Sequence, residues 1–136
     1  MSTRALAFAT ALFVLACEDD SKPVDPVWGK QACASCTMLV SDPRFAAQLA
    51  TRDGARVYFD DPGCMAAWMR EHPRLAQHAW VRSPAATWID ARTARFVRGQ
   101  RSPMGYGFAP VDQGDAAWSD VAAEADLRAA AEGGTP

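Results

Sequence analysis

The chain has 136 residues, 49% of them hydrophobic and 22% charged, with a net charge of −2 at pH 7. This length suits one small domain or two very small ones, and the composition is that of a globular protein, which excludes wholesale disorder. The slightly acidic balance excludes nucleic acid as a partner, because phosphate binding needs a concentrated basic surface.

The N-terminus has the pattern of an export signal. Arg4 precedes an uncharged apolar run over residues 5–16, which suits a signal-peptide core and is too short to cross a bilayer. We therefore predict a signal peptide over residues 1–16. The run ends in "VLAC", which resembles a bacterial lipobox, so Cys17 is a candidate for lipidation and membrane anchoring. A plain secretory signal or a lone apolar helix is the alternative.

The stretch that follows is polar and rich in proline. Residues 17–27 cannot bury a core, so we predict a flexible tether there. The folded part is expected to begin near Val27 and Trp28 and to cover residues 28–131. Residues 132–136 are predicted to form a loose tail.

The first part of the folded region reads as two strands, a helix and a third strand. Strands are predicted over residues 45–51 and 55–59, joined by a turn at Asp53-Gly54, which is a strong hairpin signal. A short amphipathic helix should follow, with Asp61 as its cap, Pro62 at its first position and Pro73 as its stop. Residues 78–83 resemble a further strand.

A second, weaker series of elements follows. Residues 87–90 and 94–97 are strand-like, residues 100–110 form a glycine-rich loop, and the end of the chain has helical spacing. Two small units, covering about residues 28–84 and 85–131, predict an α+β fold with antiparallel sheets.

The cysteines are the first candidates for chemistry. With Cys17 assigned to lipid, three remain, and an odd number in an exported protein leaves at least one free thiol or an external partner. A disulfide between Cys33 and Cys36 is one interpretation, favoured by an oxidising compartment. A thiol–disulfide oxidoreductase is disfavoured, because the residues after Cys36 resemble a strand and not the helix that would lower a thiol pKa.

A structural zinc site also has weak support. It would need three cysteines together with His72 or His78, and the sequence has no second paired spacing. His72 falls at a predicted helix end, where a cation meets the negative end of the helix dipole.

Two methionines favour a softer metal ion. In an extended segment Cys36 and Met38 would leave the same face, and thiolate with thioether suits Cu(I). Met38 taken alone is more simply a core residue. Met104 lies in a loop between proline and glycine, where it is a better ligand candidate than a methionine in a helix.

The residues around the predicted helix start have simple structural interpretations. Met65 belongs to the apolar face of the helix, and Cys64 is most simply a buried, inert thiol, with a ligand role as the alternative. Asp60 and Asp61 are interpreted as turn and cap residues.

Five motifs in order resemble the NosL family, the copper-chaperone lipoproteins encoded with nitrous oxide reductase. They are "VLAC", "CASCTMLV", "YFDDPGCMAAWM", "AWV" followed by "TWIDARTARFVRG", and "SPMGYGFAP". The resemblance implies a non-enzymatic protein, anchored by lipid on the periplasmic face of a bacterial membrane. It would bind Cu(I) and deliver it to nitrous oxide reductase through an ABC-type assembly complex.

The resemblance also implies two ββαβ units, related to the organomercurial lyase fold, and a ligand set. The family's metal-binding positions fall on Cys36, Met38 and Met104, with Cys33 as helper or disulfide partner. Cys36 is expected to supply the anionic thiolate. Thr37 stands where the family pattern has glycine, and the C-terminal end lacks the usual closing strand, so the second unit is expected to be less complete. A cell-envelope oxidoreductase using Cys33 and Cys36, or a passive structural lipoprotein, is the alternative function.

Overall fold

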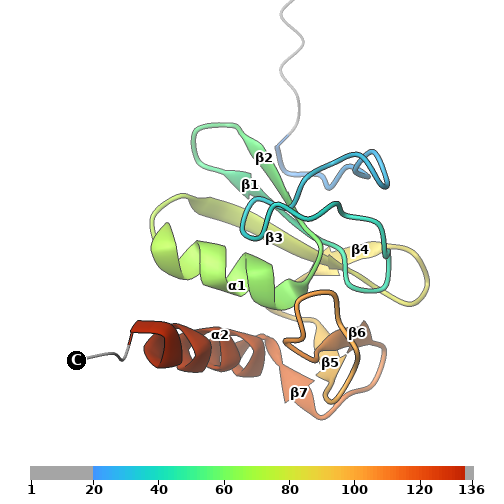
Figure 1. Ribbon diagram of the computed structural model, residues 1–136. Coiled ribbons are helices and arrows are strands. Elements are labelled where there is room, and N and C mark those ends of the chain that lie inside the picture. Colours follow the sequence, from blue (N-terminus) through green and yellow to red (C-terminus); the bar gives the residue numbers. More distant parts are fainter. Residues whose placement is uncertain (1–19, 134–136) are drawn as a thin grey trace, which may run out of the picture.

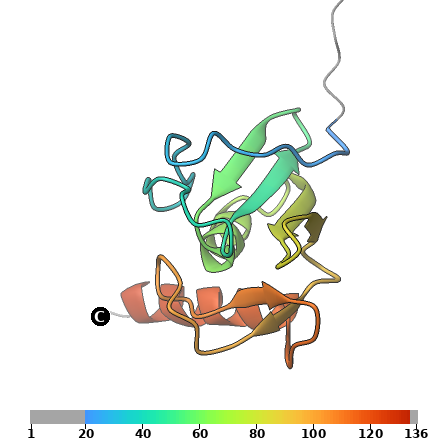
Figure 2. The same ribbon diagram turned by 90° about the vertical axis from the view of Figure 1, so that its right-hand side faces the viewer.

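The computed structural model describes residues 20–133, so the predicted signal peptide and Cys17 lie outside the described residues. The fold is α+β, with two antiparallel sheets and two helices, which confirms the predicted class. Helix α1 (Pro62–Glu71) lies between the larger sheet and helix α2 (Trp118–Gly133), as Figures 1 and 2 show from two sides. Within the described residues, neither helix is long and apolar enough to cross a membrane.

The larger sheet has four strands in the order β2-β1-β3-β4, each antiparallel to its neighbour. The predicted hairpin is confirmed, and Gly54 adopts the left-handed backbone that its turn requires, with φ at +86°. The strands are β1 (Ala47–Thr51), β2 (Arg56–Phe59), β3 (Ala76–Arg82) and β4 (Trp88–Asp90).

Helix α1 begins and ends where its sequence signals predict. The Asp61 side chain caps it by accepting a hydrogen bond of 2.9 Å from the backbone N–H of Gly63, and Pro62 occupies the first turn. At the other end, the backbone N–H of His72 donates to the carbonyl of Trp68. The apolar face of α1 packs on the larger sheet through Met65, which is fully buried with Phe59.

The smaller sheet has three short strands in the order β6-β5-β7. We expected residues 87–90 and 94–97 to belong together in the second unit, but β4 extends the first sheet by pairing with β3. The second unit is therefore three short strands followed by a helix. Its strands are β5 (Arg95–Val97), β6 (Ala109–Val111) and β7 (Ala116–Ala117).

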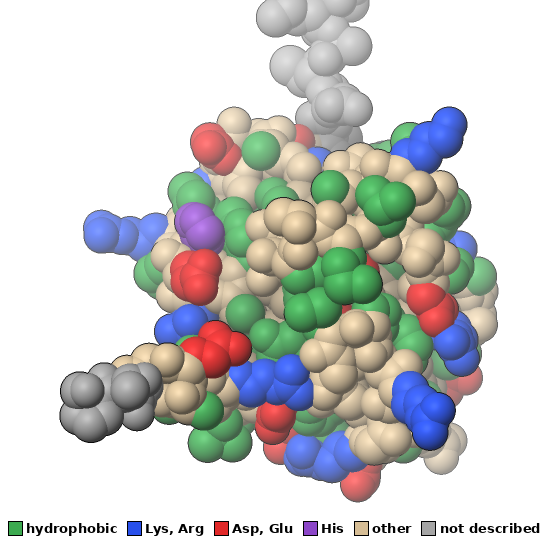
Figure 3. All heavy atoms as spheres, in the orientation of Figure 1, with side chains coloured by type: hydrophobic (Ala, Val, Ile, Leu, Met, Phe, Trp, Pro, Cys, Tyr) green, Lys and Arg blue, Asp and Glu red, His purple; other side chains and the backbone are tan. Residues whose placement is uncertain are grey.

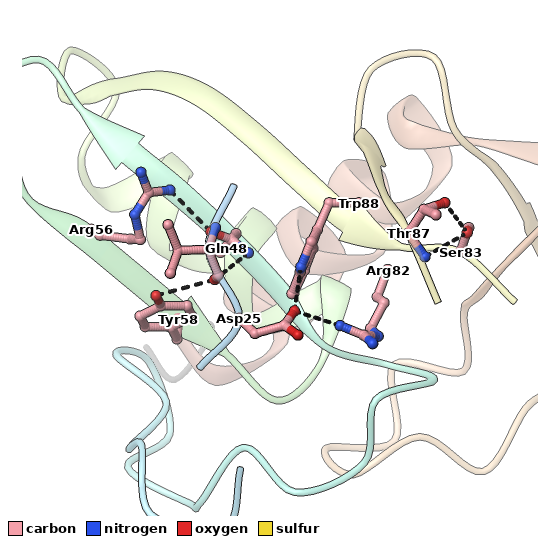
Figure 4. Close-up of polar contacts among 9 residues, drawn as sticks. Asp25, Gln48, Arg56, Tyr58, Arg82, Ser83, Thr87 and Trp88 are labelled. Carbon is pink, nitrogen blue, oxygen red and sulfur yellow. Dashed lines mark hydrogen bonds and ion pairs between the residues drawn. The ribbon is translucent and has the colours of Figure 1, made fainter. Parts of the chain in front are cut away.

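An N-terminal strap, residues 23–27, covers the face of the larger sheet opposite α1 (Figures 2 and 4). Strand β1 is buried along its whole length. The polar side chain of Gln48, on the face toward the strap, is therefore buried too and needs hydrogen-bond partners. The Gln48 amide donates to the carbonyl of Val24 at 2.9 Å and accepts from its N–H at 3.0 Å. Arg56 donates to the same Gln48 oxygen at 3.0 Å.

Asp25 fixes the strap at a second point. One of its carboxylate oxygens accepts from the guanidinium of Arg82 at 2.6 Å and from the indole N–H of Trp88 at 2.7 Å, as Figure 4 shows. Residues 17–27 were predicted to be a flexible tether with folding from about Val27. The structure places the start of the folded part earlier, because a buried glutamine on the central strand takes its partners from Val24.

Candidate metal centre

Three thiols and one carboxylate meet at one end of α1. The potential ligand atoms of Cys33, Cys36, Asp60 and Cys64 all lie within 4.8 Å of one another. We call these four residues the thiol–carboxylate cluster. Two members come from the turn at residues 33–36, Asp60 follows β2 directly, and Cys64 lies in the first turn of α1. The cluster therefore depends on packing between segments about 30 positions apart.

The CxxC segment forms a tight turn, and the prediction of a strand-like run after Cys36, over residues 37–40, is wrong. The backbone N–H of Thr37 donates to the carbonyl of Cys33 at 3.0 Å, and the N–H of Cys33 donates to the carbonyl of Met38 at 2.7 Å. Only an isolated bridge between Ala32 and Leu39 remains of the expected strand. The residues from Cys36 to Met38 therefore follow a turn and do not alternate as they would in a strand.

Thr37 holds this turn in a strained conformation. Its φ is +66°, in the left-handed region where a β-branched residue is an outlier. This is the position at which glycine was expected from the family pattern, and glycine adopts such angles freely. Left-handed backbone costs an L-residue about 1–2 kcal/mol. The strain is held in the segment that presents Cys36.

Thr37→Gly is expected to raise the free energy of unfolding by about 1 kcal/mol, since relief of strain exceeds the extra entropy of an unfolded glycine. Urea denaturation of the reduced protein would measure it. Ala86→Gly is a matched comparison, because Ala86 also has a positive φ, at +60°, in the β3–β4 turn, so the same relief of strain should stabilise that variant too. A lower stability for Thr37→Gly would contradict the assignment of strain to this residue.

The three thiols differ in how readily they lose a proton. The pKa of Cys33 is lowered to about 7, chiefly because the Cys64 thiol donates a hydrogen bond to it, helped by the backbone N–H groups of Cys36, Asp60 and Ser35. Burial raises the pKa of Cys36 to about 12. Donation to Cys33 raises the pKa of Cys64 well above its usual range. Of the three thiols, that of Cys33 therefore has the lowest pKa.

The cluster is buried and contains no disulfide bond. Cys33, Cys64 and Asp60 are each 1% exposed, and Cys36 is half-buried. Within residues 20–133 the cysteines are free thiols, so the alternative of a Cys33–Cys36 disulfide is not what the structure contains. The Cys36 thiol donates to Oδ1 of Asp60 at 3.3 Å.

A pocket of about 340 Å³ opens onto this cluster and includes Met104. Cys36, Cys64 and Met104 all line it, together with residues of α1 and α2. Hydrophobic side chains gather near the middle of the face shown in Figure 3, with charged side chains mostly around them. The structure thus brings two of the sequence-predicted ligands, Cys36 and Met104, to one pocket with Cys64.

The loop that carries Met104 is held through its backbone. The N–H of Met104 donates to Oδ2 of Asp61 at 3.1 Å, and its carbonyl accepts from Arg128 at 3.0 Å. Arg128 also lies over the Tyr106 ring, 4.1 Å from its centroid. Tyr106 packs directly on Gly63, where a Cβ atom would fall 1.9 Å from the ring. The Met104 side chain itself takes no part in this anchoring and is 36% exposed.

The remaining predicted residues lie outside the thiol–carboxylate cluster. The Met38 side chain is 50% exposed, so it is not the core residue that we considered as an alternative. Its backbone N–H contributes to the environment of the Cys36 sulfur. The two histidines stack on tryptophans, His72 on Trp68 and His78 on Trp80, which agrees with their weak candidacy as ligands.

Asp60 is the cluster member that sequence reasoning missed. Of two consecutive carboxylates before a helix, only Asp61 caps it. Asp60 was interpreted as a turn residue, but it is buried beside three sulfurs. Two features of the sequence could have indicated this role. Helix capping needs only one of the two aspartates, and Asp60 lies four positions before a cysteine, Cys64.

Comparison with known families agrees with this geometry. Residues 23–125 match the sequence model of the NosL family, which is well over half of the chain. The chain belongs to the NosL family. Comparison with curated proteins and with solved structures gives no match. NosL proteins are copper-binding accessory proteins of bacteria, so membership, together with a cluster of three thiols and a carboxylate, supports metal binding by this NosL protein.

Proposed function

We propose that this NosL protein is a Cu(I) chaperone of the bacterial cell envelope and not an enzyme. The observation that carries the proposal is the group of sulfur atoms that meets at one pocket. Cu(I) prefers thiolate and thioether over harder donors, and both kinds surround this pocket. The half-buried position of Cys36 supports a site that a partner could reach, whereas Cys33 and Cys64 lie deeper.

The proposed ligands are Cys36, Met38 and Met104, with Cys33 and Cys64 as supporting thiols. Cys36 supplies a sulfur at the pocket, and Met104 approaches from a loop of the second unit. Met38 is exposed two residues from Cys36, where its thioether could turn toward the ion. Neutral thioethers hold Cu(I) without locking it in place, which suits transfer to another protein.

The delivery step is also part of the proposal. After cleavage of residues 1–16, a lipid on Cys17 would anchor the protein at the periplasmic face of the membrane. Copper would then pass through an ABC-type assembly complex to an exported copper enzyme, nitrous oxide reductase. Family membership supports an envelope location and an accessory role.

A thiol–disulfide oxidoreductase is the second candidate, because the lowered pKa of Cys33 is a property that such enzymes need. The burial of this thiol argues against it. Cys33 is 1% exposed, so a protein disulfide could not reach its sulfur for direct attack. The CxxC segment also forms a turn that does not begin a helix. An insulin-reduction assay should therefore show no turnover that depends on Cys33 and Cys36.

Competition with a Cu(I)-selective chelator, on reduced protein without oxygen, tests the copper proposal. We expect Cys36→Ala to weaken Cu(I) binding by about 100-fold or more, and Met104→Ala by about tenfold. Loss of a group that only supports a ligand typically lowers metal affinity by about 10–100-fold, and loss of a ligand itself should lower it at least as much. Met104→Ala should leave the fold intact, because the loop is held by backbone groups at this residue.

Met69→Ala is the matched control, since Met69 is a thioether on α1 that lines a different pocket from the one beside the cluster. It should leave Cu(I) affinity unchanged. If none of the substitutions at Cys36, Met38 and Met104 weakens Cu(I) binding, the proposed site is wrong, and a passive structural role becomes the better interpretation.

A further inference from the structure

The carboxylate of Asp60 is the buried group that the copper proposal does not use. The side chain is 1% exposed, and its Oδ1 accepts from the Cys36 thiol. Its Oδ2 is also buried and has no hydrogen-bond partner among residues 20–133. A buried carboxylate oxygen without a partner is costly and rare, so its presence indicates a ligand that supplies positive charge.

The Asp60 carboxylate completes a four-donor set. Three Sγ atoms and one carboxylate oxygen lie within 4.8 Å of one another. In a tetrahedral site with zinc–sulfur bonds of about 2.3 Å, the donors are roughly 3.8 Å apart. The most distant pair would have to close by at most about 1 Å, which side-chain rotation can supply.

The chemistry of the set differs from that of a copper(I) site. A carboxylate oxygen is a hard donor, which Cu(I) disfavours and which zinc accepts alongside thiolates. Backbone N–H groups of Ser35, Cys36 and Asp60 point at the Cys33 sulfur, and that of Met38 at the Cys36 sulfur. Such N–H groups offset the negative charge that several thiolates carry around a divalent ion.

We propose that Cys33, Cys36, Cys64 and Asp60 form a tetrahedral site for a divalent cation of the zinc class. From the sequence we discounted zinc because a fourth ligand would have to be a histidine, and the structure supplies Asp60 in that role. The site shares its thiols with the proposed copper site, so Cu(I) and the divalent ion exclude each other. The inference rests on Asp60 and does not require copper to be the cargo.

Cobalt(II) is the probe for this site, because a tetrahedral thiolate environment gives it intense visible absorption and sulfur-to-metal charge-transfer bands. Titration of the reduced, oxygen-free protein should give this spectrum, and added Zn²⁺ or Cu(I) should remove it. Asp60→Asn is expected to weaken Co²⁺ binding by about tenfold or more and to shift the visible bands, with a clearly smaller effect on Cu(I) affinity. Glu71→Gln is the control, since Glu71 lines the same pocket outside the cluster.

Two results would overturn the site. One is an Asp60→Asn protein whose cobalt spectrum and affinity match those of the unaltered chain. The other is an equal loss of Co²⁺ and Cu(I) affinity, which would mean that Asp60 only positions Cys36. If Asp60→Asn fails to fold, Cys64→Ser provides the second test, and undiminished charge-transfer intensity would reject the set. The copper proposal is tested separately, by the Cu(I) affinity of the Cys36→Ala and Met104→Ala variants. Its failure can therefore be told apart from failure of the divalent-cation site.

Discussion

Replacing Gly63 with alanine will detach the Met104 loop from α1 and lower the free energy of unfolding by about 3 kcal/mol. The added Cβ would lie 1.9 Å from Cγ of Tyr106, so the ring must leave its place. Tyr106 also lies against Arg128, whose guanidinium binds the carbonyl of Met104, so the displaced ring takes the loop with it. Urea denaturation would measure the loss, and Cu(I) competition should show weaker binding.

A double-mutant cycle separates this clash from an ordinary helix effect. A Tyr106→Gly background removes both the ring and its Cβ, and alanine is a better helix former than glycine by about 1 kcal/mol. Gly63→Ala should therefore cost much less stability in the Tyr106→Gly protein than in the unaltered protein. Gly133→Ala is the matched control, because no atom lies within 4 Å of the added Cβ at that position. Additive effects of the two substitutions would contradict the proposed contact.

Asp61→Ala is the second change with a large expected effect, a loss of about 3 kcal/mol of unfolding free energy. Asp61 is fully buried and joins two parts of the molecule. Its Oδ1 caps α1 through the N–H of Gly63, and its Oδ2 accepts from the N–H of Met104. Alanine leaves both donors without a partner, and a buried donor without a partner costs about 1–3 kcal/mol.

Denaturation and Cu(I) competition together would check this prediction, since the Met104 loop should lose its position as α1 loses its cap. Asp42→Ala is the control. Asp42 also accepts a backbone N–H and an arginine, both from Arg44, but that ion pair is at the surface, where its removal should cost under about 1 kcal/mol. A comparable loss from both substitutions would show that Asp61 has no special linking role.

Local chemistry along the chain was enough to predict the first hairpin and α1. Asp53-Gly54 favours a tight turn whatever surrounds it, because glycine accepts the positive φ. Asp61 and Pro62 act within one helical turn, so their capping and starting roles depend on neighbours in sequence. The same holds for the CxxC segment and Met104 as candidate sulfur donors, since residue type alone indicates a soft metal.

Tertiary packing alone decided which residues meet. Strand β4 pairs with β3 and not with the strands of the second unit. Its own three residues do not specify which of these partners it takes. Strand β1 lies inside the sheet between β2 and β3, and the strap docks over it through the hydrogen bonds between Gln48 and Val24. Asp60 becomes a candidate ligand only because packing places it beside Cys33 and Cys64. Distances between segments about 30 residues apart are set by the core, and no local pattern specifies them.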